Sequence, residues 1–221
     1  MRGRGTVVET LAVYGGTILA LRVLNDLSQE SVVGPYLYVL VPAIFIYVPI
    51  AVILIRKASP GAHGITLHRP LLSLKIALGT SIVVLPAFAL AFHLYTRVLF
   101  GTTIHPALPD LDTFFRLCVQ HFLCIALAEE IFYRGYIQSR MNAVWKRPLR
   151  ILGAPVGLGL IYANLLFAIG HPLVRGDVAS LATFFPGLLF GWLRERCDSV
   201  LASTLFHGAC NLTMILLQGA F

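Results

Sequence analysis

Residues 36–55 read YLYVLVPAIFIYVPIAVILI, an apolar run without a charged side chain. At about 1.5 Å per residue, a helix of this length crosses the hydrocarbon core of a bilayer. The whole chain has the same character, because 57% of its 221 residues are hydrophobic and 12% are charged. Its mean hydropathy is +0.82. A membrane is therefore the expected solvent for most of this chain.

Several stretches approach the ~20 apolar residues that a transmembrane helix needs. They are residues 6–24, 36–55, 73–100, 113–138, 151–171, 179–194 and 199–219. We expect an all-α, polytopic transmembrane bundle of roughly six to eight helices, with seven favoured. The long third stretch is expected to tilt or break near Pro86. Residues 58–72 are expected to lie half-buried on the surface.

We expect one integral membrane domain, in which residues 1–112 supply N-terminal transmembrane helices and residues 113–221 form a helical core. Lys and Arg are concentrated in alternate connecting segments, and short basic loops stay on the cytoplasmic side. The N-terminus is therefore predicted to be cytoplasmic and the C-terminus external. The basic residues that set this orientation are Arg2, Arg4, Arg56, Lys57, Arg69, Arg140, Lys146, Arg147, Arg150, Arg194 and Arg196. The intervening segments carry Asp26, Glu30, Asp110, Asp112, Arg175 and Asp177.

Charge and cysteine usage exclude other classes of protein. The net charge of +7 forms no continuous basic face, which argues against a nucleic-acid partner. The four cysteines have neither CxxC spacing nor the density of a disulfide scaffold, so we interpret them as small apolar core residues. The first apolar stretch is expected to be a retained helix, since it lacks a signal-peptide cleavage site. Short loops favour a prokaryotic cell membrane.

The stretch 113–138 contains AEEIFYRG, with Glu129, Glu130 and Arg134 inside an apolar helix. A charged side chain at mid-membrane costs about 3 kcal/mol on insertion scales, so each one needs a partner or a function. Glu130 and Arg134 are four residues apart on one helical face, which predicts an ion pair. Glu129 is turned about 100° away and lacks a helical counter-charge. Glu129 is therefore the candidate general base.

Two later helices add further polar side chains. One ends in FAIGH, with Phe167 one turn before His171, and the last contains HGACN, with His207 one turn before Asn211. A lone membrane histidine is more often packing than a ligand. Two carboxylates, an arginine, two histidines and an asparagine together predict helices that bundle around one polar cavity. Gly187 and Gly191, spaced as GxxxG, predict close helix packing inside the bundle.

These ordered motifs resemble those of the CPBP family of intramembrane proteases, which includes CAAX prenyl endopeptidases and Abi-type proteins. The resemblance covers roughly residues 113–215 and rests on three motifs. They are the Glu-Glu pair with its following arginine, the Phe with a His four residues on, and the His with an Asn four residues on. It implies a glutamic-type endopeptidase that cleaves a membrane-anchored protein or peptide in the lipid bilayer.

The resemblance also implies that the helical core of residues 113–221 is catalytic, and it implies roles for individual residues. Glu129 and His171 would activate a water molecule, while His207 and Asn211 would stabilise the oxyanion. Glu130, Arg134 and Phe167 would support the site. No cofactor is favoured, because the chain has no HExxH and the His–Asn pair supplies the electrophilic role. In the alternative, zinc would be held by Glu129, His171 and His207.

The predicted topology contains one conflict. Glu129 falls in the cytoplasmic half of its helix, whereas His171 falls near the external end of the next, a mismatch on the order of 10 Å. Tilting, or a helix that continues past Arg134, would remove it. The competing functions are a proton-coupled transporter and a catalytically silent scaffold. Prenylated tails, bacteriocin leaders and C-terminal sorting segments stay open as substrates.

Overall fold

The computed structural model describes residues 2–28 and 34–219, and within these ranges the chain is built almost entirely of helices. Six helices among the described residues are long and apolar enough to cross a membrane. The predicted all-α polytopic bundle is confirmed. Glu30, assigned above to an external loop, lies outside the described residues.

The longest element is a continuous helical run from Leu111 to Asn142, which we call the central helix. It is composed of α4 (Leu111–Cys118), η3 (Val119–Ala126), α5 (Leu127–Glu130), η4 (Ile131–Gln138) and α6 (Ser139–Asn142). The other long helices are α1 (Arg2–Leu27), α2 (Leu37–Ile55), α3 (Pro70–Phe100), α7 (Leu158–Arg175), α8 (Phe184–Cys197) and α9 (Val200–Gln218). Short 3₁₀ turns are η1 (Gly34–Tyr36), η2 (Gly61–His63) and η5 (Val178–Thr183).

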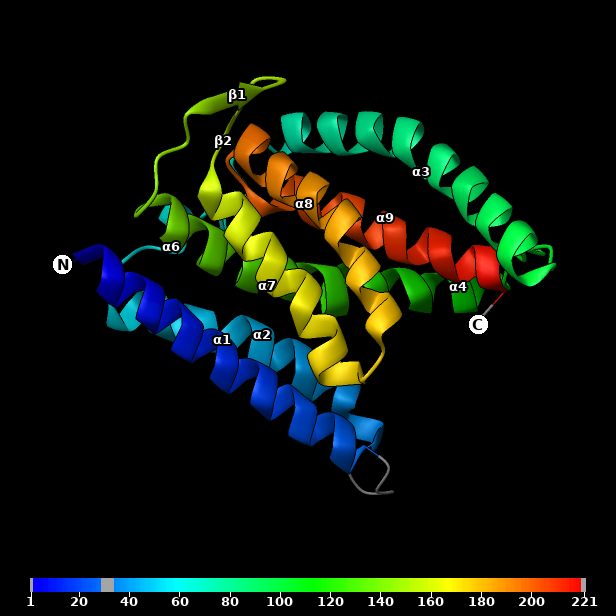
Figure 1. The fold of residues 1–221 in the computed structure, drawn as a ribbon, viewed down its shortest axis with the longest axis horizontal. Coiled ribbons are helices and arrows are strands. Elements are labelled where there is room, and N and C mark those ends of the chain that lie inside the picture. The colour runs from blue at the N-terminus through cyan, green and yellow to red at the C-terminus, as the bar shows by residue number, and fades with distance from the viewer. Residues whose placement is uncertain (1, 29–33, 220–221) are drawn as a thin grey trace.

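The helices form a bundle around the middle of the central helix, which contacts α2, α7, α8 and α9. Helices α1 and α2 pack together on one side of it, and α3 packs outside against α9 (Figure 1). Helix α3 remains a single element through Pro86 and curves over α9 (Figure 1). The core therefore lies between the α1–α2 pair and the α8–α9 pair.

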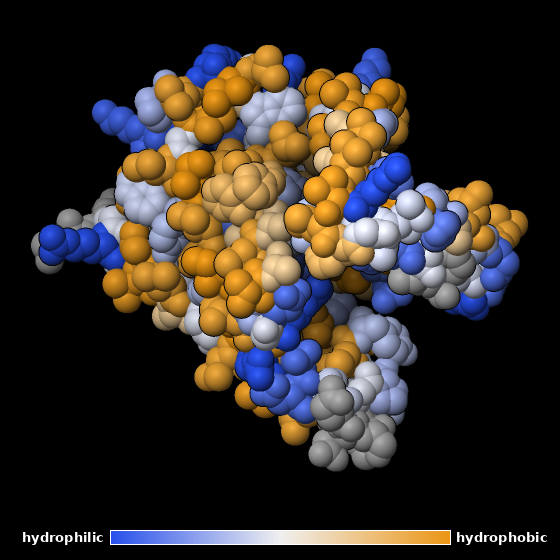
Figure 2. All heavy atoms as spheres, turned by 45° about the vertical axis from the view of Figure 1, so that its right-hand side comes forward, coloured by the Kyte–Doolittle hydropathy of each residue, from blue (hydrophilic) through white to orange (hydrophobic). Residues whose placement is uncertain are grey.

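The outside of the bundle is apolar. Large side chains such as Leu19, Ile55, Ile82 and Val98 are more than half exposed. Figure 2 shows hydrophobic side chains over much of one face of the molecule. Such a surface is stable where lipid replaces water, so the bundle is an integral membrane protein.

Two predicted segments differ from the structure. Residues 151–157 are not the start of the fifth helix. Strands β1 (Leu149–Ile151) and β2 (Ala154–Val156) instead form an antiparallel hairpin in which Arg150 pairs with Pro155. Its two-residue turn, Leu152-Gly153, has positive φ at both positions (47° and 85°), as a tight hairpin turn requires. Helix α7 therefore starts seven residues later than the predicted start at residue 151 and continues to Arg175.

Residues 58–69 form turns that include the 3₁₀ turn η2, and residues 70–72 are the first turn of α3. This loop is anchored to the bundle by hydrogen bonds from Val200 N to Gly64 O (2.9 Å) and from Ser199 Oγ to Thr66 O (2.6 Å). The sixth predicted span also differs, because α8 (Phe184–Cys197) starts after the 3₁₀ turn η5 and is too short to cross a bilayer alone.

The basic connecting segments gather at one end of the bundle. Arg140 Nη2 donates to Glu9 Oε1 (2.9 Å) and Arg194 Nη2 donates to Ser139 Oγ (3.1 Å). Arg56 pairs with the same Glu9. These contacts hold together the start of α1, the end of α2 and the end of the central helix.

Candidate active site

The Glu-Glu pair lies in a short α-helical turn, α5, between two π-helical segments, η3 and η4. A π-helix closes i→i+5 hydrogen bonds, and such segments often occur at functional sites. Glu130 is fully buried, whereas the side chain of Glu129 is 12% exposed. The local winding therefore presents two adjacent carboxylates to different surroundings.

Glu130 is held by the ion pair that its spacing predicts. Arg134 Nη1 donates to Glu130 Oε1 at 3.0 Å, and both side chains are buried. Arg134 Nη2 donates to the carbonyl oxygen of Gly187 at 3.0 Å. The guanidinium carbon lies 4.2 Å from the ring centre of Phe167 and 5.1 Å from that of Phe190, so cation–π contacts add to the pair.

His207 joins the two glutamates. Its Nδ1 lies 3.0 Å from Glu130 Oε1 and its Nε2 lies 3.8 Å from Glu129 Oε2. Because Glu130 is an acceptor already paired with Arg134, the hydrogen bond assigns the proton to Nδ1. The ring stacks on Phe190, with centroids 4.4 Å apart and planes 14° apart. His207 is therefore fixed with Nε2 facing Glu129.

His171 is fixed by its own helix. Its Nδ1 donates to the backbone oxygen of Phe167 at 2.8 Å, and its ring meets the ring of Phe167 edge-on at 4.7 Å. A carbonyl oxygen only accepts, so the proton lies on Nδ1 and Nε2 of the neutral imidazole is an acceptor. Phe167 thus contacts both His171 and Arg134.

Glu129 and His171 line one cavity of ≈ 180 Å³, which lies between α1, α2, the central helix and α7. Tyr133 and Gly170 line it beside them, and its remaining walls are Ile18, Leu21, Asn25, Leu37, Val41, Phe45, Val174 and Arg175. A cavity of this size holds several water molecules. The expected axial mismatch between Glu129 and His171 is absent, because the central helix continues to Asn142 and α7 continues to Arg175.

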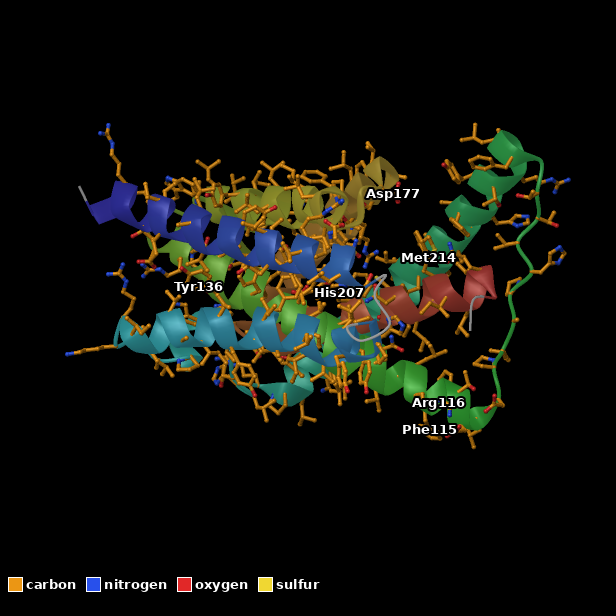
Figure 3. All side chains as sticks on the ribbon, turned by 90° about the horizontal axis from the view of Figure 1, so that it is seen from below. Phe115, Arg116, Tyr136, Asp177, His207 and Met214 are labelled. Carbon is orange, nitrogen blue, oxygen red and sulfur yellow. The ribbon has the colours of Figure 1, made fainter. Side chains whose placement is uncertain are left out.

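The other predicted site residues lie away from this cavity. Neither His207 nor Asn211 is among its lining residues. His207 lies in the middle of the molecule, with Tyr136 toward one end and Met214 toward the other (Figure 3). Asn211 is half-buried one turn beyond His207, and no hydrogen bond of the described residues involves its side chain. The structure therefore brings together Glu129, Glu130, Arg134, Phe167, His171 and His207, and leaves Asn211 apart.

The three residues of the alternative zinc site are not arranged as a metal-binding set among the described residues. Among residues 2–28 and 34–219, no three His, Cys, Asp or Glu side chains are arranged to hold a metal ion. Glu129, His171 and His207 therefore do not form a preorganised ligand set.

A second buried polar cluster was not predicted from the sequence. Glu195 Oε1 accepts from Gln138 Nε2 and Asn142 Nδ2, both at 2.7 Å, and its Oε2 accepts from Arg147 Nη1 at 2.7 Å. Gln138 Nε2 also donates to Gly191 O at 3.0 Å. The sequence feature that could have indicated this cluster is a matching four-residue spacing in two helices. Arg134, Gln138 and Asn142 face the equally spaced Gly187, Gly191 and Glu195.

The GxxxG pair of α8 acts inside the bundle, as predicted. A Cβ at Gly187 would overlap Asn164 Oδ1 and lie 3.2 Å from Arg134 Nη2, and one at Gly191 would lie 2.7 Å from Leu160. Only a residue without a side chain allows the α8 backbone to approach these groups. Both glycine carbonyls accept hydrogen bonds from the central helix.

Comparison of the whole chain with curated proteins and with solved structures finds no match. A family model described as the Rce1-like type II CAAX prenyl endopeptidases matches residues 112–213. This range begins at the central helix and includes all three motifs, from Glu129 to Asn211. Residues 112–213 are therefore similar to the CAAX protease family that the ordered motifs predicted.

Proposed function

We propose that this protein is an intramembrane endopeptidase in which Glu129 activates a water molecule held beside His171. Its family supports protease activity at a membrane. The observation that carries the mechanism is the cavity that Glu129 and His171 share. Neither oxygen of Glu129 accepts a hydrogen bond from the described residues, and His171 bonds to them only through Nδ1, which leaves Nε2 as an acceptor.

Two acceptors can orient one water molecule. The water donates one hydrogen to Glu129 and the other to His171 Nε2, which leaves an oxygen lone pair for a peptide carbonyl in the cavity. As the carbon–oxygen bond forms, the water proton passes to Glu129 and the π electron pair of the carbonyl moves to its oxygen. The protonated Glu129 then gives this proton to the leaving amine when the carbon–nitrogen bond breaks.

The remaining polar groups would hold this arrangement. Arg134 neutralises Glu130, and Glu130 orients His207 toward Glu129. We propose that His207, whose Nε2 lies 3.8 Å from Glu129 Oε2, acts electrostatically on the Glu129 carboxylate. The family resemblance gives His207 and Asn211 an oxyanion role. In that role both side chains must move toward the cavity when substrate binds.

The substrate would be a membrane-associated protein whose tail or leader is extended beside the cavity. Apolar side chains from α1, α2 and α7 form most of the cavity wall, which suits a segment that arrives from the bilayer. Prenylated tails, bacteriocin leaders and sorting segments remain the candidate substrates, and the cell membrane of a prokaryote remains the proposed location.

The test is cleavage of candidate peptides by the purified protein in reconstituted vesicles. Glu129→Gln keeps the size of the side chain but removes the base, so the cleavage rate should fall by about 10²–10⁴. The matched control is Glu9→Gln, because Glu9 is a helix carboxylate outside the cavity. Full activity of Glu129→Gln would refute the mechanism. Loss of wild-type activity on chelation, restored by zinc, would refute the metal-free form.

The orientation has its own test. Because the basic segments gather at one end of the bundle, we propose that this end is cytoplasmic. A reporter fused after Arg150 should be cytoplasmic and one fused after Phe221 should be external. The reverse result at both positions would invert the proposed orientation.

A further inference from the structure

We propose that the hydroxyl of Tyr133 is a further oxyanion donor of this site, beside the His207 and Asn211 that the family resemblance gives this role. The proposal rests on the proposed function. Tyr133 lines the cavity together with Glu129, His171 and Gly170. It follows Glu129 by four residues, so both side chains lie on the same face of the central helix. The two residues that would hold the nucleophilic water and this phenol therefore meet in one space.

The Tyr133 hydroxyl is available to donate a hydrogen bond to a ligand. The residue is only 2% exposed, yet no hydrogen bond of the described residues involves its hydroxyl. The hydroxyl oxygen is not among the unpaired side-chain atoms that are shut off from solvent, so it can reach the cavity that its residue lines. A ligand group that enters the cavity can therefore accept a hydrogen bond from this hydroxyl. A carbonyl oxygen that gains negative charge during attack is such a partner.

The ring of Tyr133 is held rigidly, as an oxyanion donor must be. It packs edge-on against Phe132 at 5.0 Å and Phe167 at 5.1 Å, and tilted against Phe45 at 5.9 Å. A donor that is already oriented stabilises developing charge without reorganisation during the reaction. Phe167 also fixes His171 and Arg134, so the phenol and the proposed water site share one support.

Gly170 makes room for this hydroxyl. A Cβ at Gly170 would lie 2.8 Å from Tyr133 Oη, 3.2 Å from Ile18 Cδ1 and 3.3 Å from Tyr14 Oη. Two phenols therefore face the same glycine beside His171. They differ in one respect, because Tyr14 Oη donates to the backbone oxygen of Leu166 at 2.9 Å, whereas Tyr133 Oη makes no hydrogen bond with the described residues. Tyr14 is thus a matched control.

In the proposed step, Tyr133 donates a hydrogen bond and keeps its proton. Water adds to the carbonyl carbon, its proton passes to Glu129, and the carbonyl oxygen becomes negative against the Tyr133 hydroxyl. When the carbon–nitrogen bond breaks, the carbonyl re-forms and the proton on Glu129 passes to the amine. The interaction is stronger in the transition state than with the bound substrate, so it should affect kcat more than KM.

The experiment compares Tyr133→Phe with Tyr14→Phe in vesicles that contain a peptide cleaved by the wild type. Tyr133→Phe should lower kcat by about 10²–10³ with KM nearly unchanged. Its melting temperature should equal or exceed that of the wild type, because no native hydrogen bond is lost. Tyr14→Phe should show the opposite pattern, with activity retained and a lower melting temperature.

A second variant tests the position of the hydroxyl. Gly170→Ala should displace Tyr133 Oη and lower kcat in the wild-type background, but should lower it much less in the Tyr133→Phe background. Tyr133→Phe activity within about twofold of the wild type, or a loss that appears only in KM, would overturn the role. If Glu129→Gln is inactive in that case, the proposed function stands. If Glu129→Gln is active, both proposals fail.

Discussion

Two glutamates on neighbouring helices, the partly exposed Glu129 and the buried Glu195, have opposite surroundings. Both oxygens of Glu195 accept hydrogen bonds, and Arg147 supplies the opposite charge. Glu129 Oε2 accepts none from the described residues, and its side chain lines the cavity. The closest ionisable nitrogen to Glu129, in His207, is 3.8 Å away. One carboxylate is satisfied by the fold and the other is left for a ligand.

The difference in hydrogen-bond partners distinguishes a carboxylate with a structural role from one with a functional role. A buried network in which every polar group has a hydrogen-bond partner fixes one packing arrangement. A buried polar group without a partner lowers stability, so its presence calls for another explanation, such as a catalytic role. Glu195 ends a ladder in which Arg134, Gln138 and Asn142 contact Gly187, Gly191 and Glu195 in equal steps. This ladder aligns α8 with the central helix. Glu129 contributes nothing comparable to packing.

The largest effect should come from substitution of Glu129 and His171, the two residues proposed to orient the water molecule. Glu129→Gln and His171→Ala should each lower the cleavage rate by about 10²–10⁴, since each removes one of the two acceptors that orient the water. Because the two residues act as a unit, the double variant should be little slower than either single one. Rate losses that multiply in the double variant would show that the two side chains act independently.

Removing Arg134 should have the largest effect on stability. Arg134→Ala leaves the fully buried Glu130 without its counter-charge, which should cost about 3–5 kcal/mol. The matched control is Arg22→Ala in the exposed pair with Asp26, which should change stability by about 1 kcal/mol or less. The measurements are yield and melting temperature in detergent. Equal stability of the two variants would mean that buried Glu130 does not need the positive charge of Arg134.

A smaller loss of stability is expected when a glycine of α8 that faces the central helix is substituted. Gly187→Ala should cost about 1–3 kcal/mol, because its methyl group would overlap Asn164 and crowd Arg134. Gly79→Ala in α3 is the control, since a Cβ there meets nothing within 4 Å. Alanine favours helix more than glycine does, so the control should be neutral or slightly stabilising. Thermal melting of both variants tests whether α8 needs this close approach.

The smallest effect concerns the loop outside the membrane helices. Burial of His63 lowers its pKa, and the nearby Arg140 and Arg194 add to this. The unfolded chain therefore takes up a proton at a higher pH than the folded one, so His63 contributes stability near pH 7.5 that is lost as the pH falls. Between pH 7.5 and 5.5 the wild type should lose about 1–3 °C more in melting temperature than His63→Gln. Identical profiles would exclude this contribution.

The sequence predicted the helices and the polar residues better than the contacts between them. Long apolar stretches and the Glu130–Arg134 spacing depend on local rules, and both predictions are confirmed. The hairpin at 149–156 was missed because its residues are as apolar as a membrane helix. Glu195 was missed because its partners lie on other parts of the chain. Tyr133 could have been noticed, since it is four residues from Glu129.

The most direct test of the contrast is cleavage per folded molecule in Glu129→Gln and Glu195→Gln, measured together with their melting temperatures. Both substitutions replace a carboxylate with its amide isostere. We expect Glu129→Gln to melt at or above the wild-type temperature and to lose cleavage by about 10²-fold or more. Glu195→Gln should melt lower and should cleave at close to the wild-type rate per folded molecule. An active Glu129→Gln, or a stable but inactive Glu195→Gln, would contradict the proposed division between the two glutamates.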